Sequence, residues 1–141
     1  MNIKRYIDMA VKKQLRKMFV DDTINEDYMA LENAVNSLVK IIRNFDKKLL
    51  EEDVDKGIFE FGDIRGDSGR VVGNLYLMLQ DFPKRNSCIS RLNKAFSYAE
   101  EIKQDLRRLE RAEGHSYSSV YPYLDGIFKG LNLLKNKCIS M

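Results

Sequence analysis

The sequence predicts an all-α fold, a bundle of four long helices plus one short buried helix, in a single domain covering residues 1–141. Apolar residues recur at intervals of three and four along most of the chain, which is the period of one face of a helix. Only two prolines interrupt the 141 residues. Apolar residues make up 44% and charged residues 32%, a composition typical of a globular chain with a packed core.

The first two predicted helices cover residues 3–19 and about 23–49. In the first, the apolar positions Ile3, Ile7, Val11 and Leu15 form one stripe. In the second, apolar residues alternate in steps of four and three for more than three heptads, which indicates a partner helix. These positions are Ile24, Tyr28, Leu31, Val35, Leu38, Ile42, Phe45 and Leu49.

The segment from Glu51 to Gly69 predicts a long, glycine-rich loop. An acidic cluster is followed by four glycines, and the helical period is lost. The next stretch, residues 70–82, is apolar on nearly every side and ends at Pro83, so it predicts the short buried helix.

The last two predicted helices cover about 86–113 and 119–138. Gly114 is the expected stop of the first, and Ser119 is the expected cap of the second. The inner positions of the final helix again step by four and three, at Val120, Leu124, Ile127, Leu131, Leu134 and Cys138.

Several function classes lack the residues they need. The chain has one histidine and two cysteines, Cys88 and Cys138, without a CxxC or HExxH motif, so we expect no metal site. The glycine-rich segment lacks the Gly-Lys-Ser/Thr of a phosphate-binding loop, and we expect no cofactor. Neither a signal peptide nor a membrane-spanning run is present, which favours a cytoplasmic protein with reduced thiols.

Charge is distributed unevenly beneath a net charge of +3. Residues 1–20 carry six basic side chains and one acidic, residues 21–83 carry seven basic and fourteen acidic, and residues 84–141 carry eleven basic and six acidic. Two basic helices side by side would follow a nucleic-acid backbone, whereas a solvated surface explains the same residues. The nucleic-acid-binding candidates are Lys12, Lys13, Arg16, Lys17, Arg91, Lys94, Arg107, Arg108 and Arg111.

Aromatic residues form the candidate protein-contact surface. Tyr117, Tyr121 and Tyr123 cluster around Pro122, and Phe59 and Phe61 lie in the expected loop. Aromatic clusters are common in interfaces, and they are equally common in cores, so both interpretations stay open.

Two motifs resemble known families. Arg108 and His115, separated by six residues, resemble the Arg-x(4–6)-His motif of the HEPN family, which implies an all-helical RNase with these two residues as catalytic candidates; Leu109 stands where that family has a polar residue. Phe82-Pro83-Lys84, with the basic helix and the final helix after it, resembles the four-helix accessory proteins of diversity-generating retroelements. The second resemblance implies binding to nucleic acid and to a polymerase, and covers less than half of the chain.

The first functional expectation is a non-enzymatic helical bundle that binds another macromolecule. Such a protein would be an adaptor, regulator or inhibitor, or an accessory protein of a phage or mobile element, and it could act as a homo-oligomer. One histidine and scattered acids do not assemble a nucleophile, a base and an oxyanion site. The alternative is a nucleic-acid-binding accessory protein that uses the basic helices, and the third is a HEPN-like RNase.

Overall fold

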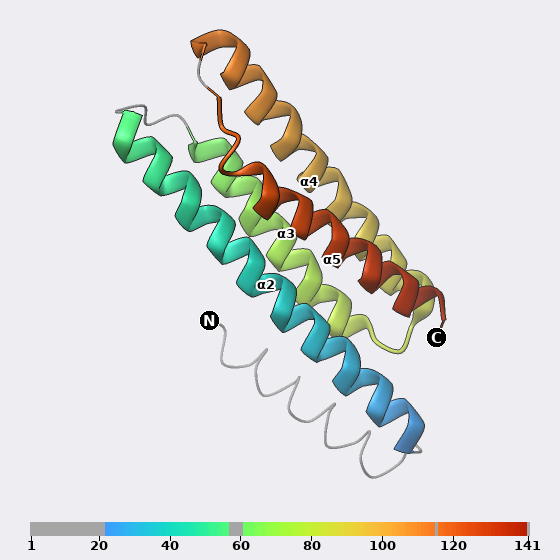
Figure 1. Ribbon diagram of the computed structural model, residues 1–141. Coiled ribbons are helices and arrows are strands. Elements are labelled where there is room, and N and C mark those ends of the chain that lie inside the picture. The colour runs from blue at the N-terminus through green and yellow to red at the C-terminus, as the bar shows by residue number, and fades with distance from the viewer. Residues whose placement is uncertain (1–21, 57–60, 115, 141) are drawn as a thin grey trace.

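The computed structural model describes residues 22–56, 61–114 and 116–140. These residues form four helices and no strand: α2 (Asp22–Lys56), α3 (Gly62–Asp81), α4 (Arg85–Glu113) and α5 (Tyr121–Ile139) (Figure 1). The all-α prediction is confirmed. The helix predicted over residues 3–19 lies outside the described residues.

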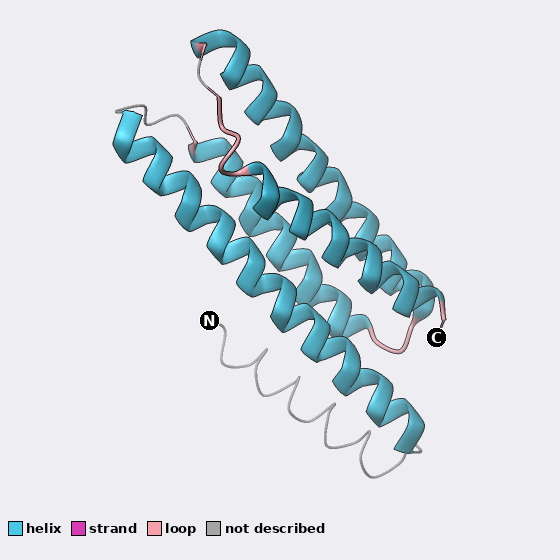
Figure 2. Ribbon diagram, viewed as in Figure 1, coloured by secondary structure: helices cyan, strands magenta, loops and turns pink. Residues whose placement is uncertain are grey.

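The four helices lie side by side with their long axes nearly parallel (Figure 2). Consecutive helices run in opposite directions, and α5 returns to pack on α2, so each helix contacts two neighbours in a closed ring. Among the described helices, none combines the length and the apolar character that crossing a bilayer requires.

The heptad patterns of α2, α4 and α5 point into one core. All the predicted inner positions of α2 from Tyr28 to Leu49 are buried, and so are those of α5 from Val120 to Cys138. Helix α4 contributes Cys88, Leu92, Ala95, Ala99, Ile102 and Leu106. Burying these stripes against each other supplies the main free energy of folding, at about 25 cal/mol per Å² of apolar surface.

The predicted loop over Glu51–Gly69 and the predicted short helix are both wrong. Helix α2 continues to Lys56, and α3 begins at Gly62 and has 20 residues, so the expected short helix is the second half of a long one. Nor is that half apolar all round, because Gly73 is exposed and Tyr76 is only partly buried.

Two features of α3 concealed its helical period. Ser68 occupies a core position in a series that otherwise reads as a heptad stripe, and it satisfies its hydroxyl by donating to the Ile64 carbonyl at 3.2 Å. The full series is Phe61, Ile64, Ser68, Val71, Leu75, Met78 and Phe82, all buried. The glycines that suggested a loop, Gly62, Gly66 and Gly69, lie on the exposed side of this helix, where tertiary packing outweighs their low helix propensity.

The turns at the helix ends follow ordinary stop signals. Residues 82–84 connect α3 to α4 through a cis Phe82–Pro83 peptide bond, and the Phe82 ring packs on Tyr28 of α2 with centroids 5.4 Å apart. Gly114 ends α4 as predicted: its φ of 70° is left-handed, and its N–H donates to the Glu110 carbonyl. Ser119 does not cap α5, because its hydroxyl donates instead to Glu52 Oε1 of α2 at 2.6 Å.

Helices α2 and α5 are in close contact at two glycines of α5. A Cβ atom added at Gly130 would lie 2.6 Å from Leu38 Cδ1, and one added at Gly126 would lie 3.3 Å from Ile41 Cγ2. The absence of side chains at these two positions therefore sets the distance between the two helices.

We expect Gly130→Val to destabilise the fold by about 1–3 kcal/mol, because the new side chain overlaps the buried Leu38. The matched control is Gly73→Val on α3, where an added Cβ meets nothing within 4 Å, and there we expect a change within about 0.5 kcal/mol. Urea unfolding monitored by circular dichroism measures both, and equal effects of the two substitutions would contradict this account of the α2–α5 contact.

Candidate functional site

The predicted aromatic contact surface divides into core and surface residues. Phe61 and Tyr117 are buried, and their rings pack edge to face with centroids 5.3 Å apart. The interpretation of these two residues as protein-contact residues is therefore wrong, since they join the start of α3 to the α4–α5 connection. Tyr123 is exposed at 36%, whereas Phe59 lies outside the described residues.

Two glutamates of α4 hold the α4–α5 connection in place. Glu110 Oε2 accepts from the Tyr117 backbone N–H at 3.2 Å, and Glu113 Oε2 accepts from the Tyr117 hydroxyl at 2.9 Å. The Tyr121 hydroxyl donates to the other oxygen of Glu110. Burial, followed by the hydrogen bond and the negative charge of Glu110, raises the pKa of Tyr121 to about 12. The hydroxyl groups of Tyr117 and Tyr121 are thus used for hydrogen bonds within the chain, and their role is structural.

The basic residues of α4 do not form an uninterrupted stripe. Arg91 pairs with Asp81 of α3 at 3.2 Å, and the exposed Glu100 and Glu101 separate Lys94 from the basic residues that follow. An arginine cluster, Arg107, Arg108 and Arg111, remains exposed in the last two turns. Positive charge at the C-terminal end of a helix interacts favourably with the helix dipole. The stability of α4 alone therefore explains part of this arginine pattern. The other basic candidates, Lys12, Lys13, Arg16 and Lys17, lie outside the described residues.

The geometry of the RNase-like motif is described only for its arginine. Arg108 forms an ion pair with Asp105 one turn earlier, and His115 lies outside the described residues. A cavity of about 120 Å³ beside Arg108, between α3 and α4, is also lined by Asp63, Ile64 and Leu109, and has room for only a few water molecules.

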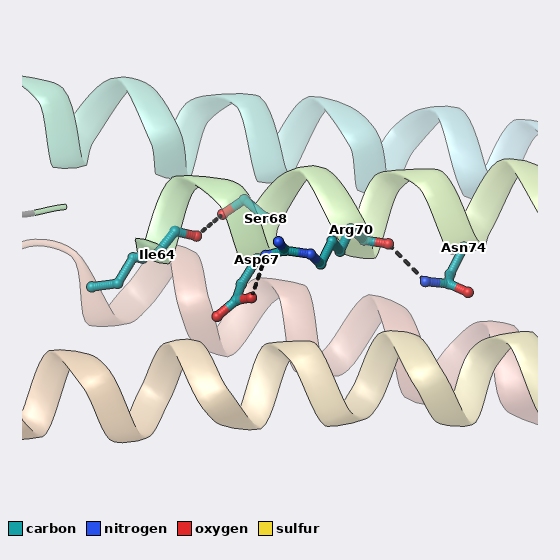
Figure 3. Close-up of polar contacts among 5 residues, drawn as sticks. All are labelled: Ile64, Asp67, Ser68, Arg70 and Asn74. Carbon is teal, nitrogen blue, oxygen red and sulfur yellow. Dashed lines mark hydrogen bonds and ion pairs between the residues drawn. The ribbon is translucent and has the colours of Figure 1, made fainter. Parts of the chain in front are cut away.

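Acidic side chains in the interior face different helices. Asp67 of α3 pairs with Arg70 at 2.9 Å and faces α4, while Ser68 faces α2 (Figure 3). Burial raises the pKa of Asp46, on α2, against the opposing effects of the Ser68 hydroxyl and the Arg65 charge. Asp46 and Asp67 therefore do not converge as a catalytic pair. Within residues 22–56, 61–114 and 116–140, no three His, Cys, Asp or Glu side chains gather where they could hold a metal ion.

A groove with a volume of about 430 Å³ lies between the first half of α2 and the end of α5. Three of the lining residues are apolar, Ala30, Leu31 and Leu133, and the others are polar or charged. The complete lining is Asp27, Ala30, Leu31, Leu133, Asn136, Lys137 and Ser140. Leu133 is 62% exposed, the highest value among the large apolar side chains of the described residues.

This groove was not predicted, although the sequence contains a weak signal for it. Leu133 lies next to Leu134 but outside the buried series of α5, so its apolar side chain points away from the core. On α2, the short side chain of Ala30 leaves space beside Leu31. Gly126 and Gly130 bring the two helices together immediately before the groove, and the larger Leu133 and Lys137 follow where the groove opens.

We expect the stability contributed by Tyr121 to be lost as the pH rises from 10.0 to about 12. The folded chain favours the neutral phenol, so this contribution is complete below the unfolded pKa and disappears through the folded one. Phenolate absorbance followed during alkaline titration should show a late-titrating component that Tyr121→Phe reduces by one tyrosine. Tyr123→Phe, which removes an exposed hydroxyl, is the control and should leave the late component in place.

No known family model matches the chain, and comparison with curated proteins and with solved structures likewise gave no match. The described residues form a groove lined by both apolar and polar side chains, and a separate arginine cluster.

Proposed function

We propose that this chain is a non-enzymatic binding protein and that it docks an apolar segment of a protein partner in the α2–α5 groove. The observation that carries the proposal is the exposure of Leu133 beside the cavity. Fully burying an exposed leucine side chain contributes about 1.5–3 kcal/mol of favourable free energy, which favours a partner at this position.

The layout of the groove supports a protein segment as the partner. Protein interfaces combine apolar contacts with polar ones, and the lining of this groove has apolar side chains together with amide, hydroxyl and charged groups. Asp27 on α2 and Lys137 on α5 carry opposite charges, so a segment with complementary charges would bind in one direction.

We expect Leu133→Glu to weaken partner binding by about 10- to 100-fold, because it places a charge where an apolar contact forms. A photo-crosslinking residue at position 133 identifies the partner in cells, and titration of the purified partner then measures affinity. Leu50→Glu is the matched control, since Leu50 is also exposed, at 45%, but lies near the other end of α2. Circular dichroism checks that both variants fold.

Equal cross-linking from positions 133 and 50, or equal affinity of Leu133→Glu and the original chain for the captured partner, would overturn the proposal. A partner that is a second copy of the chain would support the groove and identify the complex as a homo-oligomer.

The second candidate is nucleic-acid binding, favoured by the arginine cluster at the end of α4. Its three guanidinium groups are exposed within five positions, and such groups neutralise phosphates. The ion pair between Arg108 and Asp105 reduces the charge offered, which is why this candidate ranks second.

If this second function operates, affinity for RNA or DNA falls steeply with salt, and Arg107→Glu combined with Arg111→Glu abolishes binding. The 260/280 nm absorbance ratio of protein purified without nuclease, followed by a salt titration of a labelled oligonucleotide, tests it. Lys94→Glu, also on α4, is the control. An affinity that ignores both salt and the arginine substitutions rejects nucleic-acid binding.

A further inference from the structure

Three sulfur atoms meet in the core at the end of the bundle where α4 begins and α5 ends. Cys88 lies in the first turn of α4 and Cys138 in the last turn of α5, and both are fully buried thiols outside any disulfide. Met78 of α3 lies between them: its thioether accepts from Cys138 Sγ at 3.8 Å, and its carbonyl accepts from Cys88 Sγ at 3.4 Å.

The two thiols lie near each other, since both contact Met78. A side-chain hydrogen bond with Cys88 lowers the pKa of the Cys138 thiol, and this effect exceeds the opposing one of burial. A lower pKa increases the fraction of thiolate, the form that reacts with oxidants and disulfides. Fifty positions of chain separate these cysteines, so their contact is a product of the fold.

We propose that Cys88 and Cys138 are a redox-active pair that forms an intramolecular disulfide when the protein meets a peroxide. The bond would join the first turn of α4 to the last turn of α5 and clamp this end of the bundle.

The chemistry balances in two steps with hydrogen peroxide as the oxidant. The Cys138 thiolate attacks one peroxide oxygen, the O–O bond breaks, and, after proton transfer, a sulfenic acid and water result. The Cys88 sulfur then attacks the sulfenic sulfur, the S–S bond forms, the S–O bond breaks, and a second water leaves. Two thiols are oxidised to one disulfide while one peroxide is reduced to two waters.

The position of Cys138 gives the oxidant a route to it. The residues that follow it, Ile139 and Ser140, are exposed, and terminal turns open at little cost in free energy. Such opening exposes the Cys138 thiol first, whereas Cys88 is held by the turn at 82–84 and stays in place to resolve the sulfenic acid.

The test treats the purified full chain with hydrogen peroxide, blocks remaining thiols under denaturing conditions, and maps peptides by mass spectrometry without reduction. We expect a Cys88–Cys138 cross-linked peptide, loss of both free thiols, and a rise in Tm on the order of 10 °C that dithiothreitol reverses. The rise follows from the closed loop of about 50 residues, which restricts the unfolded chain.

Cys88→Ser and Cys138→Ser are the matched variants, and peroxide should raise the Tm of neither. Because serine in the core can itself destabilise, each variant is compared with its own untreated sample. Two thiols that stay free, sulfinic acid in place of the cross-link, a disulfide between chains, or a cross-link without a rise in Tm would each overturn the proposal.

Discussion

The structure depends on one constraint: each helix carries a single apolar stripe, and all four stripes must be buried together. None of the helices can satisfy this alone, because the remaining faces are polar, and α3 has exposed glycines at 62, 66, 69 and 73. Each of those glycines costs about 0.5–1 kcal/mol of helix stability relative to alanine. Helix α3 therefore forms because its inner face is packed against the other helices. This packing closes the ring of four helices, and the ring fixes the positions of the other structural features.

The part of the fold that could be predicted is the part with unbroken periodicity. In α2 and α5 the heptad stripe is continuous, and the predicted inner residues from Tyr28 to Leu49 and from Val120 to Cys138 are buried. In α3 a single polar residue, Ser68, stands in the stripe, and glycines occupy the outer face, so both the periodicity and the composition resembled a loop. Helix propensity is a weak guide where tertiary contacts decide, and the contact between Phe61 and Tyr117 joins residues too far apart in sequence to be foreseen.

The groove was harder to predict than the helices, since it depends on two helices at once. A single exposed leucine such as Leu133 is ordinary in any sequence, because much of a protein surface is apolar. Leu133 indicates a binding site only in combination with Ala30 of α2, whose short side chain leaves a cavity beside the leucine.

For the tyrosine cluster the prediction failed in the opposite direction, because an interface was expected where the structure uses the residues internally. Its composition suggested an interface, but Glu110 and Glu113 bind two of the three hydroxyls within the chain.

The two ends of the bundle are held by different kinds of contact. At the α4–α5 connection, carboxylates of Glu52, Glu110 and Glu113 accept hydrogen bonds from the loop and from α5, and hydrogen bonds to charged groups are stronger than neutral ones. At the opposite end, the last turn of α5 is held by apolar packing and weak sulfur contacts, while the ion pair between Arg91 and Asp81 joins only α3 to α4. Local opening should therefore begin at the end of α5, because fewer strong contacts must break there. The groove and the thiol pair lie at this same end, so both proposals concern the part of the ring that is held by the weaker contacts.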